Sequence, residues 1–250
     1  MADSIAGVVL AAGAGLRLRP LTGVRPKAMC PVGDQPLVDH ALARFDGLTD
    51  SLAVNVHNHR ALLESHLAGR VHLSIEEPEA LGTAGALGQL RDWIDHRPVL
   101  VLNADTYCPS SVGLLLDGWD GVRARVLIAG GSAFGPHVGL AGCALPWNEI
   151  ANLRPEVSGL YQRTLNRAVQ EGRLDVVRLP DDAVCIDCGT PAQYLAANLQ
   201  WSGGESVIGA GAVVDGAVEQ SVIWPGAHVR ADERLSRAIR AGERLTVLVR

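Results

Sequence analysis

The residues best suited to chemistry lie near the start of the chain, in a short segment rich in glycine and positive charge. Gly13 and Gly15 stand two residues apart, Arg17 follows, and Lys27 comes directly after Pro26. Glycines let backbone amides approach phosphate oxygens closely, and a guanidinium can hold two such oxygens. Lys27 is the only lysine among the 22 basic residues, which indicates a position that needs a compact ammonium. The segment therefore predicts a binding site for phosphate groups.

Two common phosphate-binding loops do not fit this segment. A Walker A loop ends in Gly-Lys-Ser or Gly-Lys-Thr, and neither triplet is present. A dinucleotide fingerprint needs a third glycine at the position of Leu18. The pattern that remains is Gly13-x-Gly15-x-Arg17, followed by Pro26 and Lys27.

The elements that must position these residues alternate between strand and helix over about the first 130 residues. Apolar runs predict strands at 5–10, 52–56, 71–75, 98–102 and 125–130, and later at 183–187. Helical spacing predicts helices from Pro36, over 60–67, through 84–94, over 158–171 with Leu160, Leu165 and Val169 inward, and from Pro191 to Leu199. This alternation is typical of an α/β, mostly parallel, doubly wound sheet with helices on both faces.

Several polar residues follow the ends of these predicted strands. The glycine loop follows the first strand, Glu76 and Glu77 follow the third, and Asp105 follows the fourth. Because ligands of such sheets bind at the carboxyl ends of the strands, we expect these groups to converge.

The character of the chain changes at residues 202–204. Apolar residues then recur six apart, as in Ile223, Val229 and Leu235, with glycines between them. This period predicts a short left-handed parallel β-helix. The predicted domains are therefore 1–202 and 203–250, and the second would pack on the first or form a homo-oligomer contact.

The composition of the chain indicates which kinds of binding partner and which cellular compartment to expect. A net charge of −5 argues against nucleic-acid binding, and the chain has no apolar run long enough to span a membrane. The N-terminus shows no basic region typical of a signal peptide. Five cysteines, an odd number, favour reduced thiols and a cytoplasmic location. Cys185-x-x-Cys188 has no second such motif, so a zinc site is not expected, and His57 and His59 favour a polar loop.

Four motifs in order resemble the sugar-phosphate nucleotidyltransferases, closest to the mannose-1-phosphate guanylyltransferase branch. Residues 10–42, LAAGAGLRLRPLTGVRPKAMCPVGDQPLVDHAL, carry G-x-G-x-R followed by P-K. EEPEALGTAGAL at 76–87, LNAD at 102–105 and CIDCGTPAQYLAAN at 185–198 complete the match. The resemblance implies the Rossmann-like nucleotide-diphospho-sugar transferase fold, in which a hexapeptide tail is common.

The resemblance also implies a reaction and its main groups. A sugar 1-phosphate oxygen would attack the α-phosphorus of a nucleoside triphosphate, and pyrophosphate would leave. Arg17 would hold the leaving phosphates, and Lys27 would lie between the reacting phosphates as the second catalytic residue. Asp105 and Asp187 would hold Mg²⁺, a cation that favours carboxylate and phosphate oxygens.

A larger set is implied to contact the nucleotide: Leu10, Ala11, Ala12, Gly13, Ala14, Gly15, Glu77, Gly82, Thr83 and Asn103. A carboxylate at Glu77 suits the two adjacent donors of guanine, which favours GTP. Gly142 is the expected sugar contact, and mannose 1-phosphate is the expected acceptor. Residues 130–142 lack the Glu-Lys-Pro segment with which many relatives hold the sugar, so a shortened sugar lobe is expected. Uridylyl or thymidylyl transfer to another sugar 1-phosphate, and a catalytically idle regulator that binds NDP-sugar, stay open as alternatives.

Overall fold

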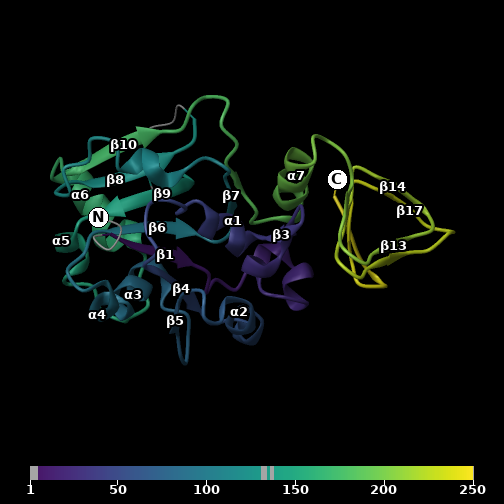
Figure 1. Cartoon of the computed structure of the whole chain (residues 1–250), viewed down its shortest axis with the longest axis horizontal. Coiled ribbons are helices and arrows are strands. Elements are labelled where there is room, and N and C mark those ends of the chain that lie inside the picture. Colours follow the sequence, from purple (N-terminus) through teal and green to yellow (C-terminus); the bar gives the residue numbers. More distant parts are fainter. Residues whose placement is uncertain (1–4, 131–133, 136–137, 250) are drawn as a thin grey trace. The chain divides into compact units, whose positions relative to one another are not determined.

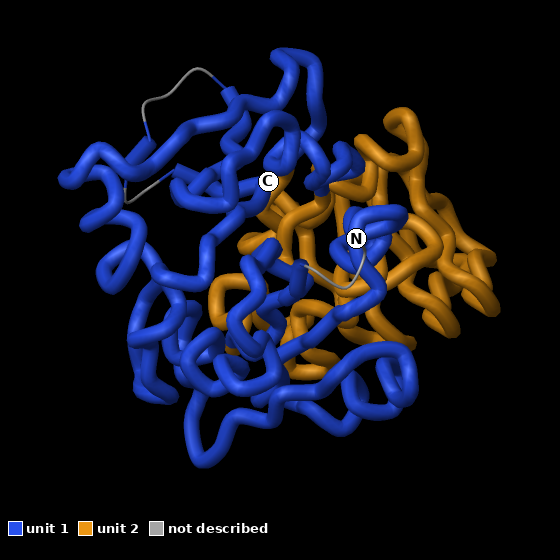
Figure 2. The backbone as a smooth tube through the Cα atoms, turned by 60° about the vertical axis from the view of Figure 1, so that its left-hand side comes forward, with its two compact units in different colours: residues 1–13, 40–104, 108–185 blue, residues 14–39, 105–107, 186–250 orange. Residues whose placement is uncertain are grey.

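The structure is a computed structural model that describes residues 5–130, 134–135 and 138–249. It divides into two compact units, shown in Figure 2. Unit 1 comprises residues 1–13, 40–104 and 108–185, and unit 2 comprises 14–39, 105–107 and 186–250. This division differs from the predicted domains 1–202 and 203–250, because three short segments from the first 202 residues pack with the C-terminal part.

Unit 1 is built on a seven-stranded sheet, visible in Figure 1. Its strands are β1 (Ala6–Leu10), β4 (Leu52–Val56), β5 (His72–Ile75), β6 (Val99–Asn103), β8 (Ala124–Ile128), β9 (Leu140–Leu145) and β10 (Leu174–Arg178). Their order is β10-β8-β9-β6-β1-β4-β5, and only β9 runs antiparallel to its neighbours. The predicted mostly parallel α/β sheet is confirmed.

Side chains of both sheet faces are buried, which explains the dense apolar runs of the strands. One face packs on α3 (Gly82–Gln89), α4 (Arg91–Ile94), α5 (Trp147–Ile150) and α6 (Asn166–Gln170). On the other face, a side chain at Gly7 would meet Phe45, just beyond α1 (Leu37–Ala43). A side chain at Gly142 would meet Val112, which begins the 3₁₀ helix η5 (Val112–Leu115). The remaining helix, α2 (Arg60–Leu67), contacts β4.

The helix predicted over 158–171 forms, but with an irregular first part. It opens with a π-helical segment, η6 (Tyr161–Leu165), and continues as α6. Leu160 and Leu165 are buried as predicted, but the inward assignment of Val169 is wrong, because this residue is 45% exposed and Ala168 is buried instead. The hydrogen bonds of a π turn span five residues, so the turn is wider than an α turn and brings Leu160 and Leu165 toward the same face. The following α turn adds Ala168, three positions later.

Unit 2 begins with three 3₁₀ turns, η2 (Leu16–Leu18), η3 (Leu21–Gly23) and η4 (Lys27–Met29), and a two-stranded pair, β2 (Pro31–Val32) and β3 (Gln35–Pro36). A second pair joins β7 (Thr106–Tyr107) to β11 (Ile186–Asp187) in antiparallel register. Helix α7 (Pro191–Trp201) follows, with the Thr190 hydroxyl accepting from the Gln193 backbone N–H at 3.3 Å and Pro191 in the first turn.

The C-terminal strands wind in coils, the triangular yellow part of Figure 1. They are β12 (Val207–Ile208), β13 (Val213–Val214), β14 (Ala217–Glu219), β15 (Val222–Ile223), β16 (His228–Val229), β17 (Arg234–Ser236), β18 (Ala238–Ala241) and β19 (Leu245–Leu248). Parallel pairing links β12-β15-β18, β13-β16 and β14-β17, while β19 closes antiparallel on β18. This pattern fits a β-helix-like segment; its left-handedness stays a prediction.

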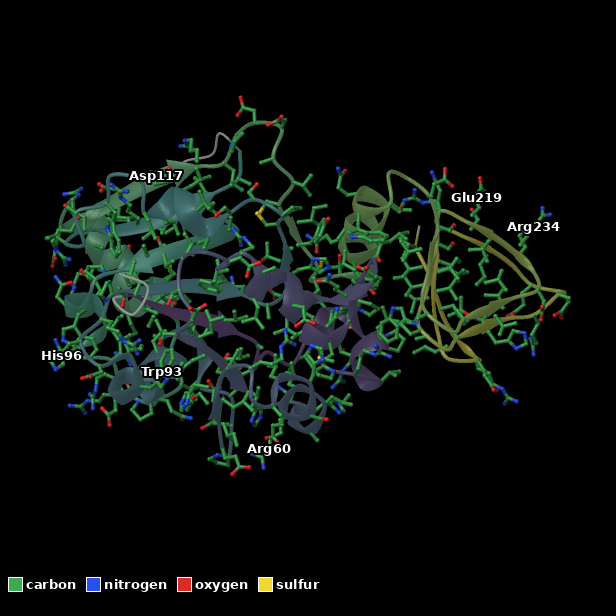
Figure 3. All side chains as sticks on the ribbon, in the orientation of Figure 1. Arg60, Trp93, His96, Asp117, Glu219 and Arg234 are labelled. Carbon is green, nitrogen blue, oxygen red and sulfur yellow. The ribbon has the colours of Figure 1, made fainter. Side chains whose placement is uncertain are left out.

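Trp224 anchors these coils within unit 2. Its indole N–H donates to the Tyr194 hydroxyl at 2.9 Å, and that hydroxyl donates to the carbonyl of Pro31. The guanidinium of Arg25 lies 4.4 Å from the centre of the Trp224 ring. On the outside of the coils, charged side chains such as Glu219 and Arg234 point into solvent (Figure 3). Across the described residues, every helix is too short or too polar to cross a membrane.

Candidate functional site

Unit 2 gathers four of the predicted site residues into one group of charges, here named the Lys27 cluster: Arg17, Lys27, Asp105 and Asp187. The Lys27 Nζ lies 2.7 Å from Asp105 Oδ2 and 3.4 Å from Asp187 Oδ1. The lysine side chain is only 9% exposed, whereas the two carboxylates are 40% and 43% exposed. The ammonium is therefore buried beneath the two carboxylates, whose oxygens stay accessible to a ligand.

A short antiparallel ladder places the two aspartates. Thr106 pairs with Asp187 across β7 and β11, and the Cys188 backbone N–H donates to the Asp105 carbonyl at 2.8 Å. Asp105 and Asp187 are thus diagonal neighbours although 82 positions separate them in the chain (187 − 105). A two-residue strand is too short to be recognised from periodicity, so only the motif around each aspartate indicated its role.

Arg17 and Gly189 complete the exposed side of the Lys27 cluster. The Arg17 guanidinium lies 3.6 Å from Asp187 Oδ2 and its side chain is 70% exposed. A Cβ on Gly189 would come within 2.7 Å of this guanidinium and 3.0 Å of the Asp187 carboxylate. The glycine of the Asp-x-Gly-Thr-Pro segment therefore leaves room for the arginine beside the aspartate.

Gly15 has a conformational reason to be glycine. Its φ of +60° lies in the left-handed region, and a Cβ there would stand 2.8 Å from the Thr22 side chain and 3.2 Å from Lys27 Cβ. The Thr22 hydroxyl donates to the Gly15 carbonyl at 3.0 Å, which fixes the turn. Gly15 therefore lets the loop close over the base of Lys27.

The donor set of the Lys27 cluster suits a hard divalent cation that brings its own phosphate ligands. Within the described ranges, no three histidine, cysteine or acidic side chains gather into a site that could hold a metal ion with protein ligands alone. Mg²⁺ commonly uses one or two carboxylates and completes its shell with water and substrate phosphates. Two half-exposed carboxylates, Asp105 and Asp187, meet that requirement.

Of the other predicted nucleotide contacts, Ala14 lies in unit 2 beside Gly15, and the rest lie in unit 1. A buried set of hydrogen bonds in unit 1, here named the Glu76 network, joins one of them, Ala11, to Asn55, Glu76 and Leu81. The Ala11 N–H donates to Asn55 Oδ1 at 2.6 Å, and Asn55 Nδ2 donates to Glu76 Oε1 at 2.7 Å. Glu76 Oε2 accepts from the Leu81 N–H at 2.8 Å, and Glu76 is fully buried. The network ties the ends of β1, β4 and β5 together, so the predicted convergence of the first loop with residues 76–77 is observed within unit 1.

Sequence reasoning missed Asn55 and the buried role of Glu76. Asn55 is the one polar residue in the strand LAVNV, at its carboxyl end, and that was the available signal. A second amide nearby, Asn58, donates from Nδ2 to the Ala12 carbonyl at 3.0 Å. The backbone of residues 11–12 is thus held by two asparagines from the neighbouring strand and loop.

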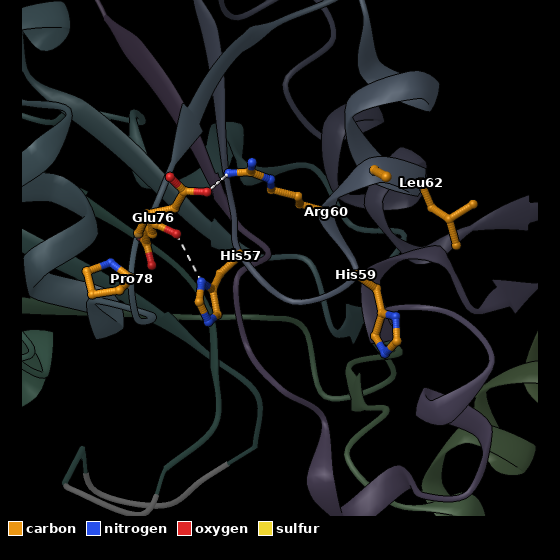
Figure 4. Close-up of a pocket in the computed structure, with 8 residues that line it drawn as sticks. His57, His59, Arg60, Leu62, Glu76 and Pro78 are labelled. Atoms are coloured by element: carbon orange, nitrogen blue, oxygen red, sulfur yellow. Dashed lines mark hydrogen bonds and ion pairs between the residues drawn. The ribbon is translucent and has the colours of Figure 1, made fainter.

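Glu77, the predicted base contact, lines a cavity of about 630 Å³ together with residues that include His57, Arg60 and Pro78 (Figure 4). Its carboxylate is 64% exposed and forms an ion pair with Arg60. His57 Nδ1 lies 2.9 Å from the Glu76 carbonyl at the edge of the same cavity. Two adjacent glutamates therefore have opposite environments, one inside the protein and one open to a ligand.

Gly82 and Thr83 have structural contacts that account for their residue types. Gly82 has φ of +70°, and a Cβ there would lie 2.6 Å from the Ser158 carbonyl oxygen. The Thr83 hydroxyl accepts from the Leu160 N–H at 2.7 Å. Their predicted role in nucleotide binding stays a prediction beside this packing role.

The last two predicted residues lie on strands. Asn103 ends β6 opposite Leu10 of β1, and the next residue, Ala104, donates its N–H to the Leu10 carbonyl at 3.0 Å. Gly142, the predicted sugar contact, is buried inside β9, where a Cβ would stand 2.7 Å from a methyl group of Leu102. Packing explains this glycine, and its sugar contact stays a prediction.

The chain resembles known proteins over much of its length. Residues 6–120 match the family model described as nucleotidyl transferase. An N-acetylmuramate alpha-1-phosphate uridylyltransferase of Caulobacter vibrioides is 36% identical over 134 residues, 48% of this chain and 55% of that protein. A mannose-1-phosphate guanyltransferase of Schizosaccharomyces pombe is 40% identical over 111 residues, 40% of this chain and 30% of that protein. The matched stretches thus span about half and about a third of these relatives.

A solved structure shares the fold. It is a putative glucose-1-phosphate thymidylyltransferase from Bacillus anthracis in complex with a sucrose, with a TM-score of 0.65 and 19% identity. The match covers 78% of this chain and 94% of the other.

Proposed function

Because residues 6–120 match the family model described as nucleotidyl transferase, we propose that this chain transfers a nucleotidyl group from a nucleoside triphosphate to a sugar 1-phosphate and releases pyrophosphate. The observation that carries the proposal is the Lys27 cluster. A buried ammonium held by two half-exposed carboxylates, with an exposed guanidinium beside them, offers the charges that phosphate groups and a divalent cation require.

The reaction needs alignment and neutralisation of charge more than covalent help from the protein. Lys27 would contact the reacting phosphates, where its fixed positive charge lowers their mutual repulsion and stabilises the transition state. Arg17 would bind the leaving pyrophosphate through its two-pronged guanidinium. An oxygen of the ionised sugar phosphate forms the new bond to the α-phosphorus as the bond to pyrophosphate breaks, so no general base is required.

Asp105 and Asp187 would hold Mg²⁺, which when bound neutralises phosphate oxygens. Lys27 occupies both carboxylates in this structure, at 2.7 and 3.4 Å. With substrate phosphates in the site, the Lys27 ammonium would have their oxygens as further partners, and the two aspartates would be the residues that hold the cation.

For the substrates, we take GTP and mannose 1-phosphate as the first pair to test. Glu77 supports GTP, because an exposed carboxylate accepts the two adjacent donors of guanine. The guanyltransferase relative supports the same pair. A second candidate is uridylyl transfer to N-acetylmuramate α-1-phosphate, favoured by the longer match to the Caulobacter vibrioides relative.

The test is a screen of nucleoside triphosphates against sugar 1-phosphates, with release of pyrophosphate as the readout and Mg²⁺ present or removed by chelation. We expect turnover with at least one pair and its loss on chelation. Absence of turnover with every pair, together with binding of an NDP-sugar, would replace this proposal by the regulatory alternative.

A further inference from the structure

Cys108 and Cys185 of unit 1 come at the point where each chain segment meets the β7–β11 ladder. The register pairs Thr106 with Asp187 and Tyr107 with Ile186. If this register continued by one residue, Cys108 would lie opposite Cys185. The two thiols share a side-chain hydrogen bond, so residues 77 positions apart (185 − 108) are in contact.

The geometry of this position suits a cross-strand bond. The Cys188 N–H donates to the Asp105 carbonyl, so the 105–188 pair is a hydrogen-bonded pair of the ladder. Such pairs alternate along antiparallel strands, and three steps further the 108–185 pair is of the other kind, with Cα atoms typically about 4.5 Å apart. Disulfides accept Cα separations of about 4.4–6.8 Å.

A buried arginine stands beside the two sulfurs. Arg44 is 6% exposed and donates from Nε to the Ser110 carbonyl at 2.9 Å and from one terminal nitrogen to the Ala141 carbonyl at 2.6 Å. Its other terminal nitrogen has no hydrogen-bond partner among the described residues. The charge of Arg44 lowers the pKa of the Cys108 thiol. A buried cation with an unused donor favours a thiolate next to it.

The other three cysteines differ from Cys108 in the direction in which their pKa is shifted. Burial raises the pKa of Cys30, Cys143 and Cys188 to about 12, which keeps them as unreactive thiols. The pKa of Cys108 is lowered instead, first by its hydrogen bond with Cys185 and then by the charge of Arg44, against the effect of burial. Cys185 is only half-buried, which gives a small oxidant access to the pair.

We propose that Cys108 and Cys185 are a redox-modification site, which forms a reversible disulfide when the protein meets a hydroperoxide. One thiolate attacks a peroxide oxygen, the O–O bond breaks and hydroxide leaves, giving a sulfenic acid. The second sulfur attacks this sulfenic sulfur, the S–O bond breaks, hydroxide leaves and the S–S bond forms. The protons of the two thiols neutralise the hydroxides, so two thiols and one hydrogen peroxide give one disulfide and two waters. Two thiols of a small reductant reverse the step.

The bond would tie together the two segments that continue into Asp105 and Asp187. Cys108 is three residues from Asp105, and Cys185 is two residues from Asp187. A covalent link at this point limits how far the two strands of the ladder can part. Oxidation of the two cysteines would therefore restrict the positions of Asp105 and Asp187 through the covalent chain.

The test uses the full chain, reduced and then exposed to stoichiometric hydrogen peroxide, with alkylation of the remaining thiols, tryptic digestion and fragment mass spectrometry. We expect a linked peptide pair that joins Cys108 to Cys185 and disappears after dithiothreitol, with Cys188 alkylated only after unfolding. Its readout is the bond itself, so it stands or falls independently of the proposed reaction. A Cys185–Cys188 bond, or Cys108 and Cys185 both still alkylated as thiols after peroxide, overturns it.

Two variants serve as controls. Cys143→Ala removes a cysteine that is buried elsewhere in the sheet and is expected to give the same linked pair. Cys185→Ser is expected to abolish the linked pair and leave Cys108 oxidised to acids that dithiothreitol restores incompletely. Circular dichroism checks the fold of each variant, and the mapping on the unaltered chain decides the proposal if a variant does not fold.

Discussion

The Glu76 network and the Lys27 cluster both contain carboxylates, but the first holds the structure together and the second is open to a ligand. In the Glu76 network, the carboxylate is fully buried and both of its oxygens accept from protein N–H groups. In the Lys27 cluster, the aspartate side chains are about two-fifths exposed and their main partner is the ammonium of Lys27. A ligand can replace an ion pair at an exposed carboxylate, but it cannot reach a buried one. The burial of a carboxylate therefore distinguishes a structural role, as in Glu76, from a ligand-binding role, as in Asp105 and Asp187.

The largest effect is expected from Lys27→Arg. The side chain is 9% exposed and its ammonium is held by two carboxylates, so the wider guanidinium does not fit the same space. We expect kcat of nucleotidyl transfer to fall by about 10² or more, measured at a temperature at which the variant is still folded. Arg91→Lys, an exchange on the surface of α4, is the matched control and should leave kcat unaltered. Near-normal turnover of Lys27→Arg would remove the cluster from the mechanism.

Asp187→Asn comes next, because it removes one of the two charged oxygen donors. The Mg²⁺ concentration for half-maximal activity should rise at least about tenfold, since a neutral amide is a weaker ligand for a hard cation. Titration of pyrophosphate release with Mg²⁺ measures this. Asp182→Asn, five residues earlier and exposed, should leave the titration curve where it is. An unchanged curve for Asp187→Asn would contradict the assignment of this aspartate to the cation.

Glu76→Gln tests the other side of the comparison by stability. The amide keeps the shape of the carboxylate but turns one acceptor into a donor that faces Asn55 Nδ2 or the Leu81 N–H. We expect the free energy of unfolding to fall by about 1–3 kcal/mol. Urea unfolding followed by circular dichroism measures the loss. A variant as stable as the parent would show that the network is not structural.

Glu77→Gln is the matched partner of that experiment and should have the smallest effect on stability, about 0–1 kcal/mol, because its ion pair with Arg60 is exposed. We expect this substitution to change mainly the preference of the enzyme for one nucleotide over another. The ratio of kcat/KM for GTP to that for UTP should fall, since an amide presents only one acceptor to guanine. If the ratio stays the same, Glu77 does not read the base.

Local pattern was enough for many elements, and it failed where packing between distant segments decides. The strand at 52–56 and the helix at 60–67 have the predicted bounds, because a buried apolar run and an apolar helical face are local signals. The sequence does not predict strand β9, since its small residues, LAGCAL, suit a strand only once β6 and β8 flank it. It predicts Val169 as inward because a π turn leaves no clear trace in the sequence.

What the sequence determined by itself was the set of chemical groups: the glycines of the first loop, a solitary lysine beside an arginine, and two aspartates in recognisable motifs. It also determined the alternation of strand and helix, because burial of apolar side chains acts over a few residues. Only the tertiary structure decided which carboxylate is buried and which is open, since Glu76 and Glu77 are the same residue type and differ only in what packs around them. It alone also brought Cys108 opposite Cys185, because strand pairing joins segments whose distance along the chain carries no information about their contact.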